Sequence, residues 1–283
     1  MRRNIQEIQQ SKRLKQRIPM ITAYDAMSAI IAEEAGAEII LVGDSLGMVF
    51  QGHDHTIPVT IDQIIYHAEI VVRMTQQPLI VGDMPFMSYA ISPEKARENA
   101  ARLMQESGVG AVKLEGGRYM APTVRSIVKS GIPVMGHLGL TPQSIHQHGG
   151  FRVQGKRHSD ARALIQAADA LQIAGAFAIV LELVPAEVAA LISQRLDIPI
   201  IGIGAGPQCD GEVQVFHDLL ALLPGKAHRH TQRFAELHPI MTQAIKEYVV
   251  AVRDGVFPTE QQSARLPAEI YDALLEEFDA SAE

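Results

Sequence analysis

Cysteine is almost absent from this sequence, because Cys209 is the only one among 283 residues. A single thiol cannot form an intrachain disulfide, so no disulfide framework is expected, and this cysteine usage fits a reducing compartment such as the cytoplasm. Cys209 lies in the turn-like stretch G-P-Q-C-D-G, with no obvious base paired to it. We therefore do not expect a cysteine nucleophile.

Long apolar runs and clustered positive charge are also missing. The most apolar stretch, residues 174–192, is interrupted by Glu182, Pro185 and Glu187, whereas a membrane-spanning helix needs roughly 20 mostly apolar residues. The first residues are charged and lack the apolar region of a secretion signal. Lys and Arg are scattered over a chain of net charge -7, so neither a membrane nor a nucleic acid is expected as a partner.

The one basic cluster lies at the N-terminus and comprises Arg2, Arg3, Lys12, Arg13 and Lys15. We interpret it as the solvated face of a helix rather than as an arm that binds a polyanion. No internal repeat and no low-complexity linker divides the chain. A single domain is therefore expected for residues 1–283.

What the sequence does contain is an alternation of short apolar runs with longer amphipathic segments. Short runs that are apolar throughout are typical of strands buried on both faces of a parallel sheet. Residues 61–75 have helical spacing, and Ser92 followed by Pro93 predicts the start of another helix. The eight runs lie at residues 20–24, 38–42, 79–82, 111–114, 133–136, 178–183, 198–203 and, more weakly, 213–216.

Repeated strand and helix predict right-handed βαβ units, and seven or eight of them favour the α/β fold of a closed (β/α)8 TIM barrel. The core should span about residues 18–258, with an extra N-terminal helix, C-terminal helices and a peripheral acidic tail at 259–283. One connection, residues 204–212, is too short for a parallel crossover with an ordinary helix. Either it contains a single helical turn or the eighth strand is misplaced.

Polar side chains stand at the ends of five consecutive runs: Asp44 and Ser45, Asp83, Lys113 and Glu115, His137, and Glu182. In a (β/α)8 barrel the C-terminal ends of the strands build the active site. Each residue alone could be a helix cap, a turn residue or half of a structural ion pair. Their recurrence on neighbouring strands instead predicts one shared functional site.

The carboxylates of this set indicate a hard metal ion. Asp44, Asp83 and Glu115 without accompanying His or Cys ligands favour Mg²⁺, or Mn²⁺, over zinc. A 2-oxo acid could complete the coordination of such an ion, with Lys113 and the Ser45 hydroxyl binding its carboxylate. The site would then suit a small oxo acid.

Glu182 is the candidate base for such a substrate, because it is set apart from the three metal carboxylates. Removal of the proton next to a metal-polarised ketone gives an enolate, so the residues indicate metal-assisted enolisation. They do not define the electrophile that the enolate attacks.

The letters G-D-S-L at residues 43–46 also match the nucleophile block of one class of serine esterases. That class needs an Asp-x-x-His pair and an Asn in a Gly-x-Asn-Asp block. No Asp of this chain is followed three positions later by His, and the only two Asn residues, Asn4 and Asn99, lie elsewhere. Ser45 would lack a base, so we interpret it as a hydrogen-bond donor to substrate.

From about residue 20 to about residue 258 the sequence resembles the ketopantoate hydroxymethyltransferase family. The resemblance rests on several long motifs in order: I-T-A-Y-D at 21–25, L-V-G-D-S-L-G-M-V-F-Q-G-H-D at 41–54, D-M-P-F-M-S-Y at 83–89, V-K-L-E-G-G at 112–117, G-H-L-G-L-T-P-Q-S at 136–144, G-G-F-R-V-Q-G-K at 149–156, L-E-L-V-P at 181–185 and I-G-I-G-A-G at 201–206.

The resemblance implies a barrel of the phosphoenolpyruvate-binding superfamily type that depends on Mg²⁺. It implies transfer of a hydroxymethyl group from the co-substrate 5,10-methylenetetrahydrofolate to 3-methyl-2-oxobutanoate. The products are 2-dehydropantoate and tetrahydrofolate, in the first step of pantothenate and coenzyme A biosynthesis. It also implies a homo-oligomer, often a decamer in bacteria.

The resemblance gives each strand-end residue a role. The metal residues are Asp44 and Asp83, as direct ligands, and Glu115, directly or through water. The oxo-acid site comprises Asp44, Ser45, Asp83 and Lys113, the proton acceptor is Glu182, and His137 contacts the new hydroxyl group. The sequence departs from the family at residues 219–223, in the H-R-H stretch at 228–230 and beyond Pro258, and these changes leave the matched positions intact.

Two other interpretations can be compared with this one. A lyase or mutase of the same superfamily, such as isocitrate lyase, would carry the signature Lys-Lys-Cys-Gly-His, which is missing around Cys209. A barrel kept as a non-enzymatic scaffold would have lost a carboxylate or the base, and none is lost.

Overall fold

The computed structural model describes residues 2–225 and 229–279, so His228 of the H-R-H stretch lies outside the described residues. The chain divides into two compact units, Met1–Ala235 and Glu236–Glu283. The first is a closed parallel barrel whose strands follow their order in the sequence, with β1 paired to β8. Its strands are β1 (Ile18–Thr22), β2 (Ile39–Val42), β3 (Leu79–Asp83), β4 (Ala111–Glu115), β5 (Val134–Gly139), β6 (Ala178–Glu182), β7 (Ile200–Ile203) and β8 (Gly211–Gln214).

The predicted TIM barrel is therefore confirmed. Strand β2 shows why the apolar runs of the sequence do not alternate between apolar and polar residues. Ile39 and Leu41 belong to the cluster that fills the barrel interior. Ile40 and Val42 belong to the second cluster, between the strands and the surrounding helices. Both faces of the strand are buried, so both need apolar side chains.

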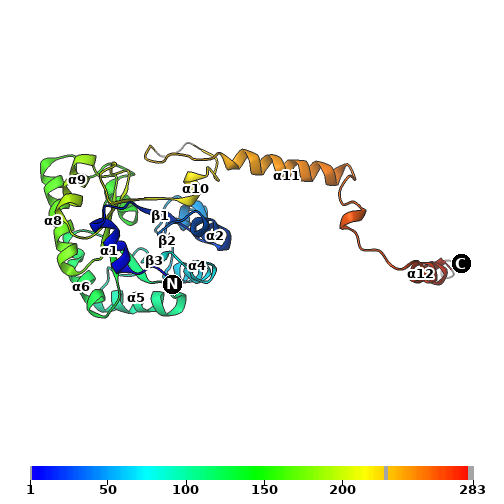
Figure 1. Cartoon of the computed structure of the whole chain (residues 1–283), viewed down its shortest axis with the longest axis horizontal. Helices are drawn as coiled ribbons and strands as arrows, with labels where there is room; N and C mark the ends of the chain where they lie inside the picture. The colour runs from blue at the N-terminus through cyan, green and yellow to red at the C-terminus, as the bar shows by residue number, and fades with distance from the viewer. Residues whose placement is uncertain (1, 226–228, 280–283) are drawn as a thin grey trace. The chain divides into compact units, whose positions relative to one another are not determined.

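The helices between the strands surround the barrel (Figure 1). Helix α5 begins as predicted, because Ser92 Oγ accepts from Lys95 N at 3.2 Å and Pro93 occupies the first turn, and it ends at Gly108 with φ of 79°. The outer helices are α2 (Ala26–Glu34), α4 (Ile61–Met74), α5 (Pro93–Ser107), α6 (Ala121–Lys129), α8 (His158–Ala174) and α9 (Ala186–Arg195). Shorter ones are α3 (Leu46–Val49), α7 (Ile145–His148) and α10 (Phe216–Leu219).

The predicted N-terminal helix is α1 (Ile5–Arg13), and it packs at the N-terminal ends of the strands. Its Ile8 is fully buried in the interior cluster. Lys12 Nζ donates to the carbonyls of Ser193 and Ile198 at 2.7 and 3.0 Å and to Asp210 Oδ2 at 2.9 Å. The interpretation of the basic cluster as a solvated face is therefore wrong for Lys12, because α1 lies against the barrel.

Arg2 is likewise not part of a solvated basic face. Its guanidinium donates to Thr75 Oγ1 and to the carbonyls of Val72, Thr75 and Pro78 at 2.6–3.0 Å. These carbonyls stand at the end of α4 and before β3, so Arg2 fastens the N-terminus to the barrel.

The connection between β7 and β8, residues 204–210, contains no helix. Strand β8 begins at Gly211, two residues before the predicted start, so the connection is even shorter than expected. It consists of turns and bends, and therefore has no single helical turn, and the small shift of the strand does not lengthen it. Asp210 Oδ2 fixes the connection by accepting from Ile200 N, Ser193 Oγ and Lys12 Nζ. Gly211 permits the tight pairing with β1, since a Cβ there would lie 2.3 Å from the Ile18 carbonyl oxygen.

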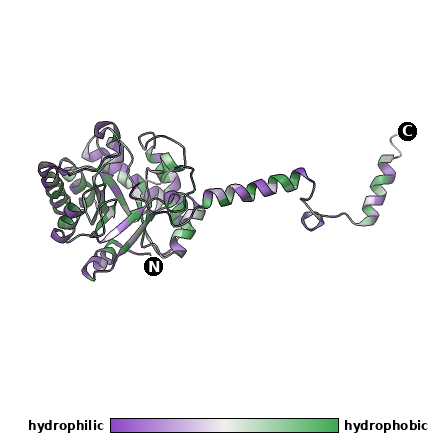
Figure 2. Ribbon diagram, turned by 90° about the horizontal axis from the view of Figure 1, so that it is seen from above, coloured by the Kyte–Doolittle hydropathy of each residue, from purple (hydrophilic) through white to green (hydrophobic). Residues whose placement is uncertain are grey.

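The second unit contains the predicted C-terminal helices, α11 (Leu237–Arg253) and α12 (Ala268–Asp279), with the 3-10 turn η3 (Glu260–Gln262) between them. Both helices carry apolar as well as polar residues along their length (Figure 2). No residue of α11 is buried, and Ile240, Ile245 and Tyr248 are more than half exposed. The barrel unit thus ends at Ala235 rather than near residue 258, and a single domain for the whole chain stays a prediction.

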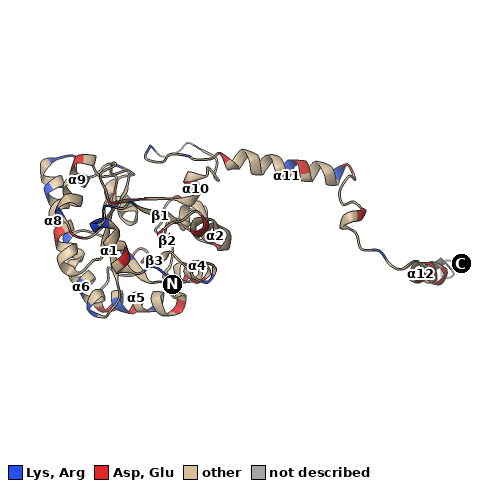
Figure 3. Cartoon of the chain, in the orientation of Figure 1, with Lys and Arg blue, Asp and Glu red and all other residues tan. Residues whose placement is uncertain are grey.

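Charged residues of both signs lie along the outer helices. On α5 and α8, segments with Lys or Arg alternate with segments with Asp or Glu (Figure 3).

Within the described ranges, no helix is long and apolar enough to cross a membrane. The expected absence of a nucleic acid partner stays a prediction.

Candidate active site

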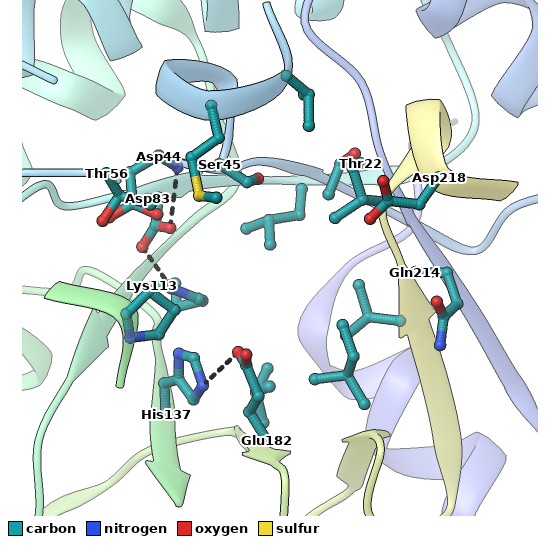
Figure 4. Close-up of a pocket in the computed structure, with 18 of the residues that line it drawn as sticks. Thr22, Asp44, Ser45, Thr56, Asp83, Lys113, His137, Glu182, Gln214 and Asp218 are labelled. Carbon is teal, nitrogen blue, oxygen red and sulfur yellow. Dashed lines mark hydrogen bonds and ion pairs between the residues drawn. The ribbon is translucent and has the colours of Figure 1, made fainter. Parts of the chain in front are cut away.

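A cavity opens at the C-terminal ends of the barrel strands, and its floor is formed by Leu41, Val180, Ile203 and Val213 of the barrel interior. All seven residues predicted from the strand ends line it: Asp44, Ser45, Asp83, Lys113, Glu115, His137 and Glu182. Figure 4 labels all of them except Glu115. Five of them lie in β3 to β6, and Asp44 and Ser45 lie in the segment that follows β2. The structure therefore brings the predicted set together at the expected end of the barrel.

Lys113 forms a buried ion pair with Asp83. Its Nζ lies 2.6 Å from Asp83 Oδ1 and 4.0 Å from Glu115 Oε1. Burial disfavours the charge of Lys113, yet the carboxylates of Asp83, Glu115 and Asp44 outweigh burial and raise the pKa of the lysine above its ordinary value. Lys113 is thus a fixed cation that faces the cavity.

The two aspartates lie side by side at the ends of β2 and β3. The backbone N–H of Asp44 donates to Asp83 Oδ2 at 3.2 Å. Burial, followed by repulsion from Asp83 and Glu115, raises the pKa of Asp44 well above its ordinary value. Burial also raises the pKa of Asp83, although Lys113 opposes this shift. The chain alone therefore leaves the negative charge of this pair incompletely compensated.

His137 stands between two glutamates. Its Nδ1 lies 3.4 Å from Glu115 Oε1, and its Nε2 lies 3.3 Å from Glu182 Oε2. Burial and the nearby Lys113 disfavour the imidazolium, but the contacts with Glu115 and Glu182 outweigh them and raise the pKa of His137 to about 9. The imidazole thus orients Glu182, whose side chain is only 12% exposed.

Gln143, which the strand-end pattern does not mark, joins the two groups of acids. Its Nε2 donates to Asp44 Oδ2 at 2.8 Å, and its backbone N–H donates to Glu115 Oε2 at 3.1 Å. Its own Oε1 accepts from Tyr89 OH at 2.7 Å, so the amide orientation is defined. Gln143 lies in the turn after β5, inside the L-T-P-Q-S motif, which is the only sequence signal for it.

Ser45 is held by a tyrosine rather than by a base. Tyr24 OH and Ser45 Oγ are 2.8 Å apart, and the Tyr24 ring is fully buried. Burial raises the pKa of Tyr24 above its ordinary value, so the phenol stays protonated and cannot activate the serine. This geometry supports the interpretation of Ser45 as a binding residue.

The donor set fits a divalent cation such as Mg²⁺. Asp44 and Asp83 supply hard oxygen atoms with uncompensated charge, and Glu115 Oε1 is buried without a hydrogen-bond partner in the described part of the chain. Among the described residues, no three His, Cys, Asp or Glu side chains are placed to hold one ion together, because Glu115 is turned toward Gln143 and His137. Mg²⁺ needs only one or two direct carboxylates when substrate and water fill the other positions.

Cys209 plays no part in the site, as predicted. It is 2% exposed, and burial raises the pKa of its thiol to about 11, so little reactive thiolate exists near neutral pH.

Residues 2–260 match the family model described as ketopantoate hydroxymethyltransferase. The chain belongs to the ketopantoate hydroxymethyltransferase family. A curated relative from Chloroflexus aurantiacus, named 3-methyl-2-oxobutanoate hydroxymethyltransferase, is 54% identical over 97% of this chain and 97% of its own length. A relative of the same name from Gluconacetobacter diazotrophicus is 54% identical over 97% of this chain and 99% of its own.

This chain of the ketopantoate hydroxymethyltransferase family also shares its fold with a more distant enzyme. A phosphoenolpyruvate phosphomutase from Streptomyces platensis subsp. rosaceus has a TM-score of 0.60 to this chain, with 15% identity over 99% of this chain and 98% of the other. At that identity the likeness concerns the fold alone, and it agrees with the (β/α)8 barrel described above.

Proposed function

We propose that this chain transfers a hydroxymethyl group from 5,10-methylenetetrahydrofolate to 3-methyl-2-oxobutanoate, with Mg²⁺ bound at Asp44 and Asp83. Water supplies the hydroxyl oxygen, and the products are 2-dehydropantoate and tetrahydrofolate. One observation carries the proposal: in a chain of this family, a base held by His137 faces two buried aspartates and a lysine in one cavity.

The oxo acid is held at the polar end of the cavity. Lys113, charged and buried, and the Ser45 hydroxyl, oriented by Tyr24, bind the substrate carboxylate. When bound, Mg²⁺ supplies a Lewis acid that polarises the keto group. The apolar floor, with Val180 and Ile203, accommodates the branched alkyl group.

Proton transfer falls to Glu182. Its carboxylate takes the proton from C3 of the oxo acid, and the electron pair of that C–H bond forms the enolate. His137 at 3.3 Å keeps the carboxylate oriented and stabilises its charge. Water adds to the methylene carbon of the donor, both C–N bonds to that carbon break as tetrahydrofolate leaves, and the carbon is released as formaldehyde. C3 of the enolate then attacks the formaldehyde carbon, which forms the new C–C bond, and the formaldehyde oxygen takes a proton to become the new hydroxyl group.

The test of this proposal is the half-reaction without folate. With Mg²⁺ and the oxo acid in D₂O, the protein should exchange the C3 proton for deuterium, as followed by proton NMR. EDTA should stop the exchange, because the keto group then lacks its Lewis acid. A protein that neither binds the oxo acid nor exchanges its proton would overturn the proposal.

Gln143 should control the affinity of the metal. Replacement of Gln143 by Leu removes the donor to Asp44, and loss of such a partner typically weakens metal binding about 10- to 100-fold. Titration of the exchange rate with Mg²⁺ should therefore show a higher half-saturating concentration but a similar plateau. Gln147→Leu, an exposed glutamine in α7, is the matched control, and equal Mg²⁺ curves for both variants would contradict this role.

The other expectations from the sequence stay predictions. These are assembly as a homo-oligomer, such as a decamer, a cytoplasmic location and the absence of a nucleic acid partner. Analytical ultracentrifugation of the full chain would decide the first.

A further inference from the structure

Among the polar side chains of the cavity that the enolisation chemistry leaves unused are Gln214 of β8 and Asp218 of α10. Both lie across the cavity from Lys113 and His137 (Figure 4). Gln214 Nε2 donates to Glu212 Oε1 and to the His230 carbonyl, whereas Gln214 Oε1 is buried without a hydrogen-bond partner among the described residues. The Asp218 carboxylate accepts no hydrogen bond from the described part of the chain. This wall offers acceptors to a ligand that brings donors.

Apart from Thr22 and His230, apolar side chains also line the cavity near this wall. Met48 and Val49 come from α3, and Val213 and Val215 lie at the end of β8. A planar ring with several N–H groups along one edge fits such a slot, because a carboxylate can accept two parallel hydrogen bonds from that edge. The pterin of a reduced folate has this chemistry, with an amino group and a ring N–H side by side.

We propose that Asp218 and Gln214 bind the pterin edge of the folate co-substrate, and that the neighbouring cavity over β6 and β7 binds its benzoylglutamate tail. This inference rests on the folate donor of the proposed function. The neighbouring cavity shares His230 with the reaction cavity, and His230 is bonded to Gln214 through its carbonyl. The two cavities are therefore adjacent at Gln214.

The neighbouring cavity suits an anionic, partly aromatic tail. Leu183 and Pro185 supply apolar contacts, while Lys156 and Arg229 supply positive charge, and no Asp or Glu is among the described residues that line it. A glutamate tail carries carboxylates that such cations attract. Charge complementarity thus selects this cavity for the tail.

The order of the strands adds a geometric reason. Strands β6, β7 and β8 are neighbours, so a ligand that runs from Asp218 past Gln214 to Leu183 crosses the end of β7. The transferable carbon of the donor lies between its pterin and its benzoyl group. It would therefore arrive beside Glu182, the last residue of β6, where the enolate is formed.

Two other cavities fit less well. One contains Arg233 and shares Met48, Val49 and Asp218 with the reaction cavity, but it also contains Asp54 and no residue of β6 or β7. Another contains Arg118 and Tyr119 but shares no lining residue with the reaction cavity. A donor tail in either would lead the transferable carbon away from Glu182.

Calorimetric titration of the Mg²⁺-loaded protein with the oxo acid present tests the proposal through binding alone. Two probes are used, tetrahydrofolate and the tail-less 6-methyltetrahydropterin. Asp218→Asn should weaken both about 10- to 100-fold, the usual effect of a lost charge-assisted hydrogen bond. The double variant Lys156→Met, Arg229→Met should weaken tetrahydrofolate by roughly 10-fold or more and leave the pterin unaffected.

The matched controls are Arg233→Met and Arg118→Met, from the two other cavities, which should bind both probes like wild type. In Asp218→Asn the loss of affinity should exceed any change in the C3 exchange rate, which also verifies that the variant is folded. If Asp218→Asn does not fold, Gln214→Met provides the same test.

Wild-type affinity in the Asp218 and Gln214 variants would overturn the inference, as would a loss of tetrahydrofolate binding in a control. If the wild type exchanges the C3 proton but binds no tetrahydrofolate, the folate donor of the proposed function fails with it, while the enolisation chemistry stands.

Discussion

Replacement of Glu182 by Gln should lower the rate of C3 deuterium exchange about 10²- to 10⁴-fold, the range that a general base contributes. The amide keeps the size of the side chain but cannot accept the proton. Binding of the oxo acid should persist, because Lys113 of β4 and Ser45 after β2 lie away from Glu182 and keep their partners. Proton NMR of 3-methyl-2-oxobutanoate in D₂O with Mg²⁺ measures the exchange, and calorimetry measures the binding.

The matched control is Glu187→Gln, which makes the same chemical change at an exposed position in the first turn of α9. It should exchange at the wild-type rate. If both variants exchanged the C3 proton at the wild-type rate, a group other than Glu182 would be the base. The contact between Glu182 and His137 would then be structural only.

Replacement of Lys113 by Met should destabilise the protein by about 3–5 kcal/mol, the usual cost of removing one partner of a buried pair. The lysine and Asp83 side chains are 4% and 1% exposed, so the remaining carboxylates cannot recover their solvation. For a domain of this size the melting temperature should fall by roughly 6–20 °C. Calorimetry in EDTA measures this effect without a contribution from bound metal.

Two comparisons make this result interpretable. Lys95→Met removes an exposed pair with Glu98 and should cost at most about 0.5 kcal/mol. The double variant Lys113→Met, Asp83→Asn should recover part of the loss, because the unpaired charge is gone. A Lys113→Met protein as stable as Lys95→Met would show that the buried pair does not support the fold.

The strands and their terminal residues could be predicted from the sequence because both depend on local pattern. A strand buried on both faces needs a continuous apolar run, and its last residue is polar when it meets a wet cavity. Asp83 and Glu182 are the last residues of such runs. In a parallel barrel the last residues of all strands lie at the same end, so the topology alone predicts that these two side chains share one end of the barrel.

The residues that the sequence pattern does not mark act through long-range contacts. Gln143 resembles any polar turn residue, and its role follows only once Asp44, 99 positions earlier, lies 2.8 Å from its amide. Lys12 resembles a surface lysine in the sequence, and its role is seen only in the folded barrel, where its Nζ donates to Asp210. Asp218 is not marked by the strand-end pattern, because it follows β8 by four residues and lies in the short helix α10.

The attachment of α1 also has a consequence for biosynthesis. The partners of Lys12 follow it by 181 to 198 residues. At ~5–20 residues per second, roughly 10–40 s pass between the synthesis of α1 and that of Asp210. During this interval Ile8 has no barrel interior to enter, so the first helix to leave the ribosome is among the last to be buried, and its apolar side chains are exposed to chaperones until β8 has been made.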